Sequence, residues 1–169
     1  MTITSDLPVL MLKYIKKRVI IMADCMTKEQ RSRNMSHIKS KDTSIELKVR
    51  KYLYHHGFRY RKNDKTLPGK PDIVLLKYRT VIFINGCFWH HHYNCKYATL
   101  PKTRQDYWLK KINKNVENDL KHYKELEQMD YKVIVVWECE LKECFEYRME
   151  QLMEEIYKNN NEYEENYNV

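Results

Sequence analysis

Hydrophobic and polar positions follow two different periods along this chain, and each period marks a kind of element. Short runs rich in β-branched residues lie at 73–76 and 80–84, on either side of the turn-like residues 77–79. Alternation in these runs predicts two antiparallel strands joined by a tight hairpin. A nearly unbroken apolar run at 132–137 predicts a strand of the kind buried on both faces of a mixed sheet, and residues 58–61 predict an edge strand.

Apolar residues spaced three to four positions apart predict helices around these strands. The segment 43–56 begins with Thr43 and Glu46 in the spacing of a capping box. A long helix is expected from Arg104 to about Met129, and an amphipathic one from Glu143 to about Tyr157. The core-facing positions expected in these two helices are Trp108, Ile112, Val116, Leu120, Tyr123 and Leu126, and then Cys144, Tyr147, Leu152 and Ile156.

A further helix is expected at 27–39, and its composition differs from that of the others. It is rich in Lys and Arg, and Met35 and Ile38 are its few apolar positions. Too few apolar residues repeat for deep burial. The segment is therefore either a solvated surface helix or a helix that contacts DNA.

The order of these elements predicts an α/β fold with a mixed sheet and helices packed on its faces. The 169 residues suffice for one domain, which we place at 22–158. Residues 1–21 are expected to be an N-terminal extension outside the fold. The polar, acidic segment 159–169 is expected to be a disordered tail.

Charge adds a partner to this picture. The net charge is +8, but from Glu140 onward nine Glu face three Lys/Arg, so the rest of the chain holds 28 basic and 14 acidic groups. So basic a body indicates a polyanionic partner, either nucleic acid or an anionic membrane surface. Lysines and Arg18 interrupt the apolar stretch 9–21, so no membrane span is predicted. We expect a soluble, cytoplasmic protein.

Cysteine and histidine spacing points to a metal. Cys87, His92 and Cys95 follow the pattern C-x4-H-x2-C, and Cys139 follows the buried strand that ends at 137. Three cysteines and one histidine are a standard tetrahedral set for structural zinc. The alternative is a group of reduced thiols, packed as small apolar side chains, beside a surface histidine.

A second, hard-metal site is indicated across the hairpin. Asp72 starts the first hairpin strand, and the second strand leads into His90, which a tight loop can turn back toward that carboxylate. Mg²⁺ prefers one or two carboxylates plus carbonyl and water oxygens, and a neutral imidazole can take a proton from water. On the residues alone, Asp72 could instead cap the turn after Pro71, Glu46 could serve only its capping box, and Asp119 could be a solvated helix carboxylate.

Two large aromatic residues, Phe88 and Trp89, lie at the tip of the loop between a glycine and the histidines. Exposed apolar side chains beside a basic surface are used to pry base steps apart. The alternative is that both rings close over the metal loop as a small satellite core.

Several motifs together closely resemble one family, the very short patch repair (Vsr) endonucleases. The likeness runs from about Met22 to Leu141. Its motifs are Arg33-Asn34-Met35, Asp42-Thr43-Ser44-Ile45-Glu46, Leu67-Pro-Gly-Lys-Pro-Asp-Ile73, Val81-Ile-Phe-Ile-Asn-Gly-Cys-Phe-Trp-His-His-His92, Asn115-Val-Glu-Asn-Asp119 and Val136-Trp-Glu-Cys139.

The resemblance implies a restriction-endonuclease-like fold and an enzyme that nicks the T-bearing strand on the 5′ side of a T:G mismatch, the product of 5-methylcytosine deamination. It implies that Asp72 and the backbone carbonyl of Ile84 bind catalytic Mg²⁺, and that His90 activates water. Asp119 and Glu46 would order metal-bound waters or neighbouring groups.

The resemblance also assigns the remaining site residues. Structural zinc would be bound by Cys87, His92, Cys95 and Cys139. The residues implied to contact DNA are Phe88 and Trp89, which would intercalate beside the mismatch, Met35 from the other groove, and Lys111 and Asn115 at the mismatched pair. Related nucleases carry an acidic-x-Lys pair on the second hairpin strand, whereas this chain, like the family, lacks it. Asn85 stands where family members have a histidine.

The expected partners follow from that activity. They are double-stranded DNA with a T:G mismatch, mismatch-repair proteins such as MutL, and functional coupling to a cytosine-5 DNA methyltransferase. The enzyme is expected to act as a monomer, nucleoid-associated when bound to DNA, and without a membrane. The alternatives are a related restriction-like nuclease or structure-selective resolvase with another DNA target, and a zinc-stabilised, non-catalytic DNA-binding module.

Overall fold

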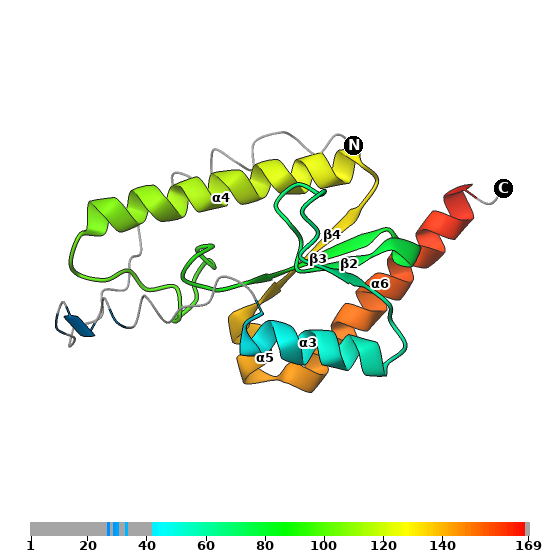
Figure 1. Cartoon of the computed structure of the whole chain (residues 1–169), viewed down its shortest axis with the longest axis horizontal. Coiled ribbons are helices and arrows are strands. Elements are labelled where there is room, and N and C mark those ends of the chain that lie inside the picture. Colours follow the sequence, from blue (N-terminus) through cyan, green and yellow to red (C-terminus); the bar gives the residue numbers. More distant parts are fainter. Residues whose placement is uncertain (1–26, 28, 31–32, 34–41, 168–169) are drawn as a thin grey trace.

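The computed structural model describes residues 27, 29–30, 33 and 42–167. Met35, most of the basic segment 27–39 and the extension 1–21 therefore lie outside the described residues. Four strands form one mixed sheet in the order β1-β2-β3-β4 (Figure 1). They are β1 (Arg61–Lys62), β2 (Ile73–Leu75), β3 (Thr80–Asn85) and β4 (Lys132–Trp137).

The predicted hairpin is confirmed. Strands β2 and β3 pair antiparallel with Ile73 opposite Ile82, and the short 3-10 helix η1 (Leu76–Tyr78) joins them. Arg79 closes the turn in the left-handed region, with φ of 46°. β4 pairs parallel with β3, so the sheet is mixed as predicted.

The edge strand predicted at 58–61 is shorter and later, because β1 contains only Arg61 and Lys62. Phe58 belongs to the helix end instead of to a strand. Its N–H donates to the carbonyl of Leu53 at 3.0 Å, and its ring is buried with an exposed fraction of 1%. The ring packs near Tyr78 and Tyr157, with centroids 5.2 and 5.4 Å away, so the chain is still in the core at this residue.

Helices cover both faces of the sheet in layers (Figure 1). Helix α4 (Gln105–Gln128) lies on one face, and α3 (Ser44–His55), α5 (Glu138–Glu143) and α6 (Phe145–Tyr167) lie on the other. Alternate strand residues divide accordingly. The core under α3, α5 and α6 includes Val49, Leu53, Ile73, Leu75, Ile82, Ile134, Val136, Met149, Leu152 and Ile156, and the core under α4 includes Val74, Val81, Phe83, Leu126 and Tyr131.

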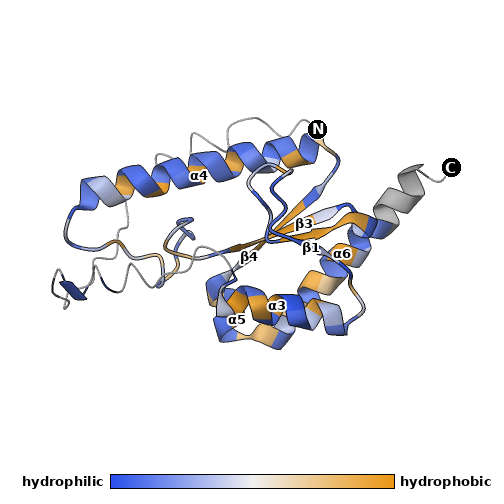
Figure 2. Cartoon of the chain, in the orientation of Figure 1, coloured by the Kyte–Doolittle hydropathy of each residue, from blue (hydrophilic) through white to orange (hydrophobic). Residues whose placement is uncertain are grey.

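The expectation that 132–137 is buried on both faces is wrong. β4 is an edge strand, and only Ile134 and Val136 of its side chains are buried, while Val133 and Val135 are intermediate. Helix α4 is mostly hydrophilic and runs on well beyond the sheet (Figure 2). Val133 and Val135 are partly exposed while Ile134 and Val136 are buried, so the unbroken apolar run reflects one fully and one partly covered face.

The C-terminal helix also differs from its prediction. The short α5 precedes it, and α6 then begins at Phe145, so Cys144 and Tyr147 are exposed while Leu152 and Ile156 are buried as predicted. The helix continues to Tyr167, where a disordered tail from 159 was expected. Asn159 connects this helix to the hairpin, because its Nδ2 donates to the Tyr78 carbonyl at 2.8 Å and to Thr80 Oγ1 at 3.1 Å. No helix in the described part of the chain is long and apolar enough to cross a bilayer.

Candidate active site

A pocket of about 950 Å³ opens where the end of β3, the start of β2 and the middle of α4 come together. Segments far apart in the sequence contribute its lining. The lining includes Glu46, Asp72, Ile84, Asn85, Trp89, His90, Lys111, Asn115 and Asp119. The structure thus brings together every residue of the expected catalytic set, and four of the five expected DNA contacts lie in this pocket or beside it.

Asp72 is held across the hairpin. Its Oδ2 accepts a hydrogen bond of 2.8 Å from the backbone N–H of Ile84, the neighbouring strand residue that sequence analysis paired with it. Desolvation raises the pKa of Asp72 to about 6, while the Ile84 N–H and the nearby Arg50 and His90 act to lower it. A carboxylate held out of water in this way gains from a cation beside it.

His90 and Asp119 form a pair. His90 leaves the loop after β3, Asp119 projects from α4, and His90 Nδ1 lies 2.5 Å from Asp119 Oδ2. When Nδ1 carries the proton it donates to the carboxylate, and Nε2 is left as an acceptor. The residue pattern alone left Asp119 as a solvated carboxylate, and the resemblance implied that it orders metal-bound waters or neighbouring groups; neither named His90 as its partner.

Asn85 lies at the back of the pocket. Its exposed fraction is 4%, and its Nδ2 donates to the hydroxyl of Tyr123 at 3.0 Å. Burial raises the pKa of Tyr123, and the negative charges of Asp119 and Asp72 raise it further. Both side chains are therefore neutral, and Tyr123 on α4 is a site neighbour whose only sequence signal was its place in the apolar stripe.

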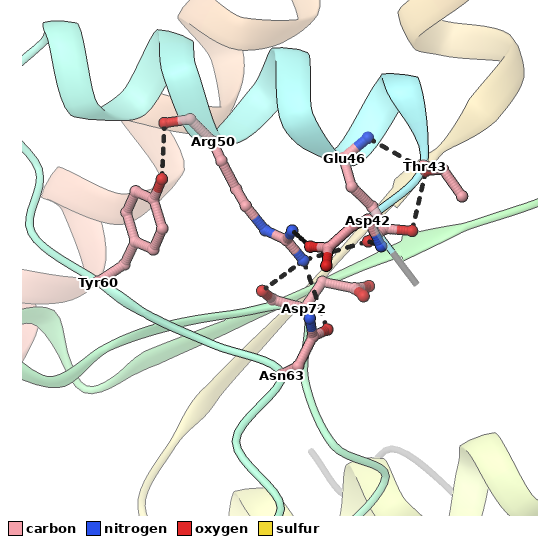
Figure 3. A network of polar contacts seen from close by, with 7 residues as sticks. All are labelled: Asp42, Thr43, Glu46, Arg50, Tyr60, Asn63 and Asp72. Carbon is pink, nitrogen blue, oxygen red and sulfur yellow. Dashed lines mark hydrogen bonds and ion pairs between the residues drawn. The ribbon is translucent and has the colours of Figure 1, made fainter. Parts of the chain in front are cut away.

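Thr43 caps the helix through Glu46 as predicted, but the Glu46 carboxylate accepts from the N–H of Asp42 at 2.9 Å instead of from that of Thr43, so the capping box is only half formed. Thr43 Oγ1 accepts from the backbone N–H of Glu46 at 3.3 Å and donates to its Oε1 at 2.9 Å. The carboxylate also faces the pocket, and its Oε2 contacts the buried guanidinium of Arg50 (Figure 3). Sequence analysis passed over Arg50, although its place one helical turn after Glu46, on the buried side of the helix, was a usable signal.

The four predicted zinc ligands converge. Ligand atoms of Cys87, His92, Cys95 and Cys139 all lie within 4.8 Å of one another. His92 Nδ1 is 3.7 Å from the sulfur of Cys87 and 3.1 Å from that of Cys139. Zn–S bonds of about 2.3 Å in a tetrahedron place two sulfurs about 3.8 Å apart, so the group has the dimensions of a zinc site.

Their surroundings suit metal ligands. Burial raises the pKa of the Cys87 thiol to about 12 and also raises that of Cys139, so an adjacent cation is needed to keep either as thiolate. Desolvation lowers the pKa of His92, which favours the neutral imidazole that binds metals. Its ring stacks on Trp137, with centroids 4.2 Å apart and planes 4° apart.

Phe88 and Trp89 form a small aromatic cluster with Trp108 of α4. The ring centroids lie 5.0 Å apart between Phe88 and Trp89, 5.3 Å between Phe88 and Trp108, and 5.9 Å between Trp89 and Trp108. Both loop rings are half-buried, which matches the satellite-core interpretation of this loop. Lys111 Nζ lies 5.2 Å from the centre of the Trp89 ring, and Asn115 Nδ2 donates to the Trp89 carbonyl at 3.0 Å.

The chain is similar to known endonucleases. Residues 23–96 match the family model described as DNA mismatch endonuclease Vsr. The type II nicking enzyme V.NmeAIP of Neisseria meningitidis is 54% identical over 80% of this chain and 97% of its own length. The DNA mismatch endonuclease Vsr of Escherichia coli is 46% identical over 72% of this chain and 77% of its own length. The type II nicking enzyme V.XorIIP of Xanthomonas oryzae is 43% identical over 72% of this chain and 89% of its own length.

These similarities extend along most of each relative. The chain therefore belongs to the Vsr family of DNA mismatch endonucleases, and it is an endodeoxyribonuclease.

Proposed function

We propose that this endonuclease nicks the thymine-bearing strand on the 5′ side of a T:G mismatch, in a Mg²⁺-dependent reaction that starts very short patch repair. The observation that carries the proposal is the meeting of Asp72 with the His90–Asp119 pair in one pocket. A half-buried carboxylate beside an oriented imidazole is typical of a site for metal-assisted hydrolysis.

Asp72 would bind the metal together with the backbone carbonyl of Ile84. Within the described residues only Ile84 donates to the Asp72 carboxylate, and it does so at Oδ2, so Oδ1 is free to bind an ion. One carboxylate with a carbonyl, completed by water and phosphate oxygens, suits Mg²⁺. Bound there, Mg²⁺ supplies Lewis-acid activation of the phosphodiester and neutralises charge on the leaving oxygen.

His90 takes a proton from the attacking water at Nε2, and Asp119 holds the ring through Nδ1 and stabilises the imidazolium that forms. Glu46, whose carboxylate lines the pocket, orders water beside Asp72. Asn85 has no proton to exchange at neutral pH, so it takes no acid or base role and serves in binding and orientation.

DNA is opened by the aromatic tip. Phe88 and Trp89 leave their packing on Trp108 to enter the stack beside the mismatch, and Met35 enters from the opposite groove. Lys111 and Asn115 contact the mismatched pair. A wobble pair costs less to unstack than a matched one, so deformability supports the choice of T:G.

Zinc bound by Cys87, His92, Cys95 and Cys139 keeps this loop rigid. We propose a restriction-endonuclease-like fold, which the mixed sheet supports, and a monomer, because one nicked strand per event requires no second subunit. The cellular setting we propose is the cytoplasm, with nucleoid association on DNA, contact with mismatch-repair proteins such as MutL, and coupling to a cytosine-5 DNA methyltransferase that creates the substrate.

A nicking assay on end-labelled duplexes tests the proposal. Duplexes with T:G, T:A and C:G at one position, with varied flanks, and a branched duplex are incubated with Mg²⁺ or EDTA. We expect one nick, 5′ of the mismatched T, only with Mg²⁺. Equal cutting of matched duplexes, or preference for the branch, would replace the proposal with the restriction-like or resolvase alternative, and binding without cutting would favour the non-catalytic module.

A further inference from the structure

Arg50 is a buried cation at the edge of the pocket. It lies on α3, its side chain has an exposed fraction of 4%, and its guanidinium points between the start of α3 and the start of β2 (Figure 3). Nη1 contacts Asp42 Oδ1 at 2.5 Å, and Nη2 contacts Glu46 Oε2 at 3.1 Å. Nη2 also reaches the backbone carbonyl of Asp72 at 3.3 Å and Asn63 Oδ1 at 3.4 Å.

The hydrogen bonds of Arg50 hold groups that line the pocket, but they leave one donor of Arg50 itself unpaired within the described part of the chain. A buried guanidinium is costly unless every donor is paired, and Nε of Arg50 is buried without a partner among the described residues. The terminal nitrogens, in contrast, are aimed at two segments that line the pocket. This pattern indicates a side chain placed for its neighbours.

One neighbour is the candidate metal ligand Asp72. Its backbone carbonyl accepts from Arg50 Nη2 and from the N–H of Asn63 at 3.4 Å, while its carboxylate accepts from Ile84 on the other side. Main chain and side chain of Asp72 are thus held from opposite directions. Removing the guanidinium would remove one of the two hydrogen bonds to the backbone carbonyl of Asp72.

The other neighbour is Glu46. Its Oε2 accepts from Arg50 and from the N–H of Asp42 at 2.9 Å, and its Oε1 accepts from Thr43. The negative charge of Glu46 raises the pKa of Asp72, and the positive charge of Arg50 lowers it.

We infer that Arg50 is a positioning residue for the metal site, which fixes Asp72 through its backbone carbonyl and holds the Glu46 carboxylate in place beside it. This inference rests on the proposed function in taking Asp72 as the metal ligand. The planar guanidinium of Arg50 contacts four acceptors at once. The single ammonium group of a lysine cannot contact all of them, so lysine would replace arginine only in part.

Two substitutions and two measurements test this role. Arg50→Met keeps the length and removes charge and donors, and Arg50→Lys keeps the charge. Binding of Mn²⁺ is followed by electron paramagnetic resonance of the free ion, without turnover, and Mg²⁺ activation by single-turnover nicking of a T:G duplex. We expect Arg50→Met to raise both half-saturating concentrations about tenfold or more, and Arg50→Lys to raise them by about threefold.

Arg148→Met is the matched control. Arg148 is similarly buried, at 9%, and bridges Glu140 and Glu155 at 3.0 Å each, but it does not line the pocket. It should lower the melting temperature and leave both half-saturating concentrations unchanged. If the role of Arg50 were purely structural, Arg50→Met would likewise lower the melting temperature and leave both half-saturating concentrations unchanged. A folded Arg50→Met protein with wild-type metal dependence therefore overturns the inference.

The remaining outcomes are also decisive. If Arg50→Met does not fold, Arg50→Lys decides, and wild-type Mn²⁺ binding in it overturns the inference. If the wild type nicks T:G duplexes while the Arg50 variants match it, the inference fails and the proposed function stands. If the wild type does not nick but Arg50→Met weakens Mn²⁺ binding, the inference stands and the proposed function fails.

Discussion

Asp119 on α4 holds His90 at 2.5 Å, although 28 residues separate them in the chain. The contact fixes which nitrogen of His90 faces the carboxylate and turns the other toward the pocket that Asp72 shares. A helix that packs on one face of the sheet thereby sets the orientation of an imidazole in the loop that follows a strand.

Asp119→Asn should therefore impair chemistry more than binding. An amide can donate to Nδ1 and trap the tautomer that has no free acceptor at Nε2, so we expect single-turnover nicking to fall about 100-fold or more. The affinity for a T:G duplex in EDTA should stay the same. Glu117→Gln, an exposed carboxylate on the same helix, is the control and should nick at the wild-type rate. An active Asp119→Asn enzyme would remove His90 from the role of base.

Asp72→Asn and Asp72→Ala should both abolish Mg²⁺-dependent nicking and retain mismatch binding. The amide oxygen of Asn can still accept from Ile84, so the hairpin stays intact while the charge that binds the ion is lost. Gel-shift affinity in EDTA and nicking with Mg²⁺ measure the two effects separately. Nicking at the wild-type rate in either variant would show that the metal is bound elsewhere.

Cys139→Ser should release the zinc ion. We expect about one zinc per wild-type chain by elemental analysis, and a clear loss of both zinc and melting temperature in the variant. Cys144→Ser is the matched control, because Cys144 is exposed and stands outside the ligand group. Equal zinc content in all three proteins would assign the four side chains to the packed-thiol alternative.

Trp89→Ala should weaken discrimination between T:G and T:A duplexes. Base–aromatic stacking contributes about 1–3 kcal/mol per base, so we expect the preference measured by competition binding to fall about tenfold. The variant also loses packing on Trp108, which thermal melting reports separately. Tyr147→Ala removes an exposed ring from α6 on the opposite face and should leave the preference unchanged. An undiminished preference in Trp89→Ala would remove the wedge from the mechanism.

Asn159→Ala should destabilise the fold. Two hydrogen bonds connect Asn159 to the hairpin, and their loss costs about 1–2 kcal/mol in the free energy of unfolding. Urea denaturation measures this change in the free energy of unfolding. Asn118→Ala on the exposed side of α4 makes the same chemical change within a helix, so it corrects for the higher helix propensity of alanine. Equal stability of the two variants would mean that α6 contributes nothing past 158.

Local patterns identified most elements. Alternation predicted the β2–β3 hairpin, and a capping box predicted the start of α3 at the residue after Thr43. The spacing C-x4-H-x2-C predicted a converging ligand group, because a loop that short brings its own side chains together. These features depend on neighbours a few residues apart, which the chain displays directly.

Other features depended on which surfaces finally cover each residue. The run 132–137 reads as doubly buried, yet β4 lies at the sheet edge, where only one of its faces is fully covered. The tail from 159 reads as disordered, yet Asn159 reaches the hairpin and the helix continues. The polar composition of this segment does not reveal the contact of Asn159 with the hairpin.

Alternation, helix caps and ligand spacing can be read from the chain, and they were enough to predict the α/β class and the family. The contact of Asp119 with His90, and those of Arg50 with Asp72 and Glu46, became visible only once the helices were packed on the sheet. Hydrogen bonds between side chains on different elements depend on packing directions that no periodicity encodes. For that reason the candidate catalytic groups could be named from the chain, while their partners appeared only in the fold.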